Sequence, residues 1–101
     1  MERVQIEWGN LERTEAIEQD IFDKAKKILE HSPNATNFLV HLKVTNPKSS
    51  PGRSMQSVAM ELRLPQHQDV ISKKEGDDLY RSIKEAQKAI LIQLESKQNR
   101  S

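Results

Sequence analysis

The sequence predicts an α+β domain in which four strands form a mixed sheet and two helices pack on one face of it, in the order β-α-β-β-β-α. Three observations lead to this prediction. Four segments alternate apolar and polar residues, which is typical of strands with one buried face. Two longer segments repeat apolar residues every three or four positions, which is typical of amphipathic helices. Because every element then has one apolar face, a two-layer arrangement buries all of them together.

The first strand and the first helix are predicted near the N-terminus. The strand has three alternating apolar residues: Val4, Ile6 and Trp8. Thr14 is a suitable N-cap for the helix, because its hydroxyl can accept a bond from a free backbone amide. The apolar stripe of that helix is formed by Ile17, Ile21, Ala25 and Ile28. We expect the helix to end at His31, because Pro33 cannot continue it.

Three further strands are predicted at residues 38–44, 58–64 and 70–74. Residues 46–54 contain two prolines and a glycine, so we expect a mobile loop there. The strands on either side of the first helix are predicted to be parallel, and the others antiparallel. The last strand has polar residues, Ser72 and Lys74, at inward positions, which predicts an edge strand.

The second helix has the most regular apolar repeat in the chain. Its stripe is formed by Leu79, Ile83, Ala86, Ile90 and Leu94. Asp77 and Asp78 precede it and are suited to capping its N-terminus. We therefore expect one domain over residues 1–96, followed by a polar, flexible tail at 97–101.

Composition excludes several classes of protein. The chain has 16 basic and 15 acidic residues and no cysteine, which excludes disulfides and thiolate metal sites. No segment has the roughly 20 apolar residues of a membrane helix, and the N-terminus does not resemble a signal peptide, so we expect a cytoplasmic protein. The three histidines lack metal-ligand spacing, and there is no glycine-rich phosphate loop or nucleophile elbow. We expect no enzymatic activity, no cofactor or metal, and no small-molecule substrate.

Helical spacing places several cations away from the two apolar stripes. They are Lys24, Lys26, Lys27, Arg81, Lys84 and Lys88. One interpretation is a solvated surface, in which Asp20 pairs with Lys24 and Asp23 with Lys27 across one helical turn. The other is that adjacent helices combine these cations into a strip that binds phosphates.

Residues 75–83, EGDDLYRSI, resemble the EGxDMYxAID signature of the ribosome hibernation-promoting factor family, which includes ribosome-associated inhibitor A. Residues 14–17, TEAI, are similar to the ITEALR entry of that family's first helix. Gln93 and Leu94 match its KLxxQL run. The chain resembles the short forms, which lack the C-terminal dimerisation domain, and the resemblance implies the same order of strands and helices.

The resemblance also implies a function. The family binds the small ribosomal subunit in the channel used by mRNA and tRNA, and silences translation in stationary or stressed cells. The six helix cations would then contact rRNA phosphates, and the protein would be monomeric off the ribosome. Three positions depart from the family, which usually has basic residues in place of Glu18, Ala89 and Ile92. The alternative is a divergent paralogue that uses the open sheet face or Ile92 as a protein-interaction module on the same fold.

Overall fold

The computed structural model describes residues 3–45 and 55–98 and confirms the predicted order of elements. The loop predicted at 46–54 lies outside the described residues, as does the segment 99–101. The last helix extends to Gln98, so the first two residues of the segment predicted as a tail are helical. The elements are β1 (Val4–Glu7), α1 (Glu15–His31), β2 (Asn37–Thr45), β3 (Met55–Arg63), the short turn η1 (Pro65–His67), β4 (Val70–Gly76) and α2 (Leu79–Gln98).

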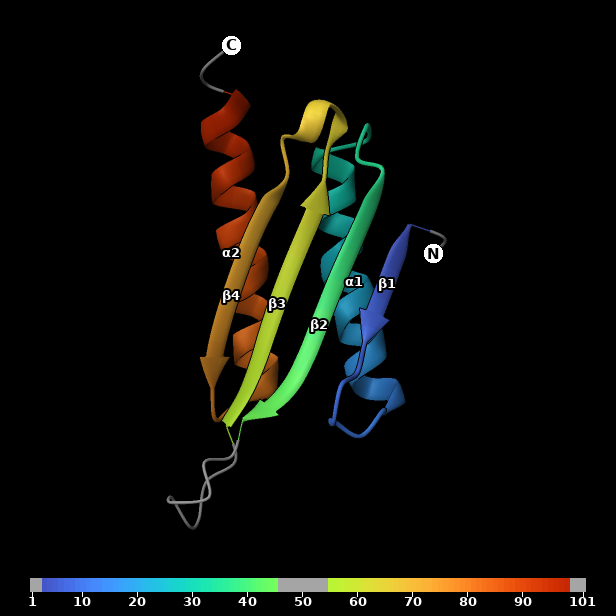
Figure 1. Ribbon diagram of the computed structural model, residues 1–101, viewed down its shortest axis with the longest axis vertical. Helices are drawn as coiled ribbons and strands as arrows, with labels where there is room; N and C mark the ends of the chain where they lie inside the picture. Colours follow the sequence, from blue (N-terminus) through green and yellow to red (C-terminus); the bar gives the residue numbers. More distant parts are fainter. Residues whose placement is uncertain (1–2, 46–54, 99–101) are drawn as a thin grey trace.

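The strands form one sheet in the order β1-β2-β3-β4. β1 is parallel to β2, and the remaining neighbours are antiparallel, as predicted. Both helices cover one face of the sheet and run in the same direction (Figure 1). β1 and β4 are therefore the two edges, and the opposite face of the sheet is not covered by any described element.

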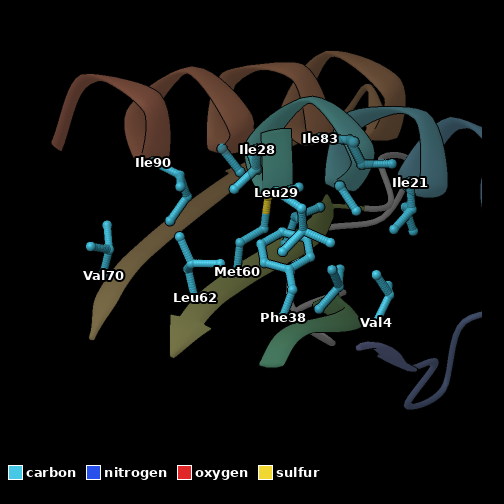
Figure 2. Close-up of a cluster of buried hydrophobic side chains, with 14 of the residues drawn as sticks. Val4, Ile21, Ile28, Leu29, Phe38, Met60, Leu62, Val70, Ile83 and Ile90 are labelled. Carbon is cyan, nitrogen blue, oxygen red and sulfur yellow. The ribbon is translucent and has the colours of Figure 1, made fainter. Parts of the chain in front are cut away.

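The core lies between the sheet and the two helices (Figure 2). Phe38 on β2 is fully buried at its centre, and Met60 lies beside it on β3, across from Val40. The side chains facing them from the helices, all fully buried, are Ile21, Ile28, Ile83 and Ile90. The polar inward position of β4 is also explained, because the Ser72 hydroxyl donates to the carbonyl of Ala86 on α2 at 3.0 Å.

The predicted caps are present at both helices. The Thr14 hydroxyl accepts a bond from the amide of Ile17 at 3.2 Å. A carboxylate oxygen of Asp78 accepts one from the amide of Arg81 at 3.3 Å. Each bond satisfies a backbone donor that the helix itself cannot pair.

β2 extends beyond β1, and a turn covers the part that β1 does not reach. Gly9 in this turn has a φ of +57°. The side-chain amide of Asn10 then pairs with the backbone of Val44, donating to its carbonyl at 3.2 Å and accepting from its amide at 2.8 Å. The side chain of Asn10 thereby makes two backbone hydrogen bonds to β2 of the kind that a longer β1 would make.

The edge at β4 is partly closed by side chains of α2. The Gln93 amide donates to the carbonyl of Ile71 at 2.9 Å, and the Lys97 ammonium donates to the carbonyl of Gln68 at 3.4 Å. The turn before β4 contains two residues in the left-handed region, Gln66 at φ 64° and His67 at φ 58°. No helix among the described residues is long and apolar enough to cross a membrane.

Candidate functional site

The two helices lie side by side, and one hydrogen bond identifies the sides that face each other. The buried Gln87 of α2 donates to the carbonyl of Lys24 on α1 at 3.4 Å. Residues three or four positions away from these two share their sides of the helices. On α1 that residue is Lys27, and on α2 it is Lys84; Lys88, one turn after Lys84, lies further toward the outward face of α2. We call Lys24, Lys27, Lys84 and Lys88 the seam lysines.

The seam lysines differ in their freedom to bind an anion. The Lys24 ammonium lies 2.9 Å from a carboxylate oxygen of Asp20, and both side chains are only about a quarter exposed, at 24% and 23%. The other oxygen of Asp20 is buried without a hydrogen-bond partner. Lys27, Lys84 and Lys88 are exposed, and within residues 3–45 and 55–98 none of them forms an ion pair.

Only one of the two salt bridges predicted along α1 forms. Asp20 pairs with Lys24 as expected. Asp23, however, accepts a hydrogen bond from the side-chain amide of Gln19 at 2.9 Å, and no ion pair joins it to Lys27. The charge of Lys27 is therefore less compensated than the sequence pattern suggests.

The remaining two predicted cations differ from the seam lysines in their surroundings. Arg81 lies on the outward face of α2 two turns before Lys88, and its guanidinium pairs with Glu85 at 3.1 Å. Lys26 follows Glu18 and Phe22 at intervals of four residues, and these two line a shallow pocket beside β1. Helical spacing from the Gln87–Lys24 contact thus places Lys24, Lys27 and Lys84 on the sides of the two helices that face each other, and Lys26 on the opposite flank of α1.

No group of three or more potential metal ligands occurs in the described part of the chain. The seam ends in an open pocket lined by His31, Leu91, Leu94 and Glu95. His41 lies on the open sheet face and contacts Glu7 at 2.8 Å.

Sequence reasoning missed the roles of Asp20 and Gln87. The i,i+4 spacing identified the Asp20–Lys24 pair but not its partial burial. Gln87 directly follows the core residue Ala86. A polar residue beside the apolar stripe is a signal for a contact between helices, although it does not identify the partner.

Comparisons with known proteins agree with this fold. Residues 4–101 match the family model described as sigma 54 modulation protein / S30EA ribosomal protein. A ribosomal subunit interface protein from Coxiella burnetii is similar in structure with a TM-score of 0.77 at 16% identity, over 95% of this chain and 97% of that chain.

The N-terminal domain of Protein Y from Thermus thermophilus is also similar, with a TM-score of 0.63 at 20% identity, over 91% of this chain and 94% of that chain. At these identities, the two structures show a shared fold. No curated protein sequence matches significantly.

Proposed function

Because the chain belongs to the sigma 54 modulation protein / S30EA ribosomal protein family, we propose that it associates with the ribosome and inhibits translation by binding rRNA of the small subunit. The binding surface is the helix seam, and the site is the channel occupied by mRNA and tRNA. The structural relative from Coxiella burnetii carries the name of a ribosomal subunit interface protein, which supports this direction. A ribosome-bound protein of this kind acts in the cytoplasm.

The observation that supports the proposal best is the set of uncompensated lysines on two rigid, adjacent helices. Lys27, Lys84 and Lys88 are exposed and project from elements fixed by the core. Ammonium groups held in this way bind phosphates without sequence preference, and the folded shape of the RNA then supplies selectivity. Inhibition requires only that the protein occupy space, so no catalytic group is needed.

The six predicted cations contribute unequally in this proposal. Lys27, Lys84 and Lys88 make the main phosphate contacts, and Lys24 contributes less because Asp20 holds its ammonium. Arg81 shares its charge with Glu85. Lys26 contacts only RNA that wraps around the far flank of α1.

Co-sedimentation with purified small subunits over a series of salt concentrations tests the proposal. We expect the logarithm of the binding constant to fall linearly with the logarithm of salt concentration. Lys84→Glu combined with Lys88→Glu removes two phosphate contacts and should flatten that slope by about 1.5, at roughly 0.7–0.9 per contact. Affinity should fall in parallel.

The matched control is Lys73→Glu combined with Lys74→Glu on β4, which changes net charge equally but lies away from the seam. If both double variants lose the same affinity, binding reflects net charge alone and the seam is not the site. Binding that does not respond to salt would exclude phosphate recognition altogether.

The second candidate function, a protein-interaction module, is favoured by one observation. Ile92 on α2 is 65% exposed and Ile71 on β4 is 59% exposed, both high values for isoleucine. A protein partner would remain bound after RNase treatment, whereas an rRNA partner would be released. Ile92→Ser should weaken only the protein interaction.

A further inference from the structure

Tyr80, in the first turn of α2, is an aromatic side chain that the core does not enclose. It is 48% exposed, and among residues 3–45 and 55–98 it is the only exposed aromatic residue. Within those ranges no residue forms a hydrogen bond with its hydroxyl. Aromatic rings carry a large apolar face, so a ring left in water offers a surface that a ligand can cover.

Helical spacing places this ring beside the seam lysines. Lys84 follows Tyr80 after four residues and Gln87 after seven, so the three side chains share one flank of α2. Gln87 contacts the carbonyl of Lys24, so this flank is the one that faces α1. Lys88 extends the row by one more turn, and successive members of the row are about 6 Å apart along the helix axis. The ring therefore lies at one end of a row of exposed lysines.

The neighbouring helix does not place a charge beside the ring. The two helices run in the same direction (Figure 1), so the residues of α1 two turns before Lys24 lie at the level of Tyr80. These residues are Ala16 and Ile17, which are uncharged. A planar, uncharged group can therefore approach the ring while charged groups attached to it reach the lysines.

We propose that Tyr80 stacks on an unpaired RNA base whose neighbouring phosphates bind Lys84 and Lys88, so that the seam selects single-stranded over duplex RNA. The proposal rests on the proposed function for the class of partner and adds the conformation of the RNA that is bound. Stacking requires a base with an open face, whereas a duplex hides the faces of its internal bases. Lysines alone would favour the duplex, because its phosphates are more closely spaced.

Binding to defined RNAs tests this selectivity without the ribosome. Fluorescence anisotropy is measured with a short labelled RNA strand, alone and annealed to its complement. We expect the wild-type chain to bind the single strand more tightly. Tyr80→Ala should lose roughly 5- to 100-fold in affinity for the single strand. Its affinity for the duplex should not change, which also shows that the variant is folded.

Two further variants separate stacking from other roles of the ring. Tyr80→Phe should bind like the wild type, because stacking does not need the hydroxyl. Ile92→Ala is the matched control, since it removes another exposed apolar side chain from the outward face of α2 and should leave RNA binding unchanged. A wild-type preference for the duplex would overturn the proposal. So would an equal loss for both RNAs in Tyr80→Ala, or a loss in Tyr80→Phe as large as that in Tyr80→Ala.

Co-sedimentation with small subunits separates this proposal from the proposed function. Stacking releases no counterions, so Tyr80→Ala should lower the binding constant by one factor at every salt concentration and leave the salt slope unchanged. Small subunits bound with the expected slope, but equally well by Tyr80→Ala, would overturn the stacking and leave the proposed function intact. A single-strand preference that depends on Tyr80, without binding to small subunits, would support the stacking and overturn the proposed function.

Discussion

Gly9→Ala is expected to destabilise the domain by about 3–4 kcal/mol, although Gly9 is exposed and lies outside the core. Two features of the structure lead to this expectation. The φ of Gly9 is +57°, in the left-handed region that residues with a Cβ atom rarely adopt. A Cβ at this position would lie 2.4 Å from the carbonyl oxygen of Leu42. That oxygen belongs to the backbone of β2 and cannot rotate away.

The magnitude follows from two contributions. A left-handed alanine costs roughly 1–2 kcal/mol. Relief of the clash requires the turn to move away from β2, which breaks the two hydrogen bonds between Asn10 and Val44. At about 1 kcal/mol for each bond, the loss adds roughly 2 kcal/mol. Domains of this size are stable by about 5–15 kcal/mol, so the variant should unfold much more easily.

Urea unfolding followed by circular dichroism measures this loss as a shift in the transition midpoint. Asn10→Ala isolates the hydrogen-bond contribution and should cost about 2 kcal/mol. Gly76→Ala is the matched control: its φ is not positive, and the nearest atom to a new Cβ is the Ser82 hydroxyl at 3.1 Å. Its free energy of unfolding should change by less than about 1 kcal/mol.

The reasoning would be refuted if Gly9→Ala cost no more than Asn10→Ala. That result would mean that the turn accepts a Cβ without strain and that only the amide contacts matter. A cost below about 1 kcal/mol would mean that the turn does not hold β2 in place at all.

Three other perturbations have defined outcomes. Phe38→Ala should cost about 3–5 kcal/mol in urea unfolding, because it removes the fully buried ring at the centre of the core; a smaller loss would show that the core collapses around it. Gln66→Asn combined with His67→Gly should raise the free energy of unfolding by roughly 1–2 kcal/mol, since both positions have positive φ; an unchanged melting temperature would contradict this. Asp20→Asn should release the Lys24 charge and steepen the salt dependence of small-subunit binding by up to about 0.9, whereas an unchanged slope would show that Lys24 makes no phosphate contact.

Most of the fold could be predicted from the sequence because periodicity reports which face of each element is buried. The first and last residues of the strands could not be predicted from periodicity. β3 begins at Met55, three residues before the predicted start, because Met55 pairs with Thr45 across the hairpin. β4 likewise extends to Gly76, which pairs with Gln56. These residues are in strands because they pair with the neighbouring strand, and not because they alternate apolar and polar side chains.

The candidate site could be predicted only as a set of residues. Helical spacing identified the outward cations, but it does not show which flank of α1 meets α2. That depends on packing between residues 63 positions apart, as in the Gln87–Lys24 contact. Spacing also could not predict which partner Asp23 contacts, because Gln19 and Lys27 both lie one helical turn away and only Gln19 bonds to it. Partial burial of Lys24 could be recognised only after the helices were placed together.

The unequal edges of the sheet determine how far any assembly of this chain can grow. Strand pairing through two open edges generates endless filaments, whereas pairing through one edge closes on itself. Gln93 occupies an outward carbonyl of β4, and Lys73 adds a charge there, while β1 remains open. Pairing at β4 would have to displace the Gln93 contact and bring like charges together, so the partial closure of this edge disfavours endless growth of the sheet at high concentration.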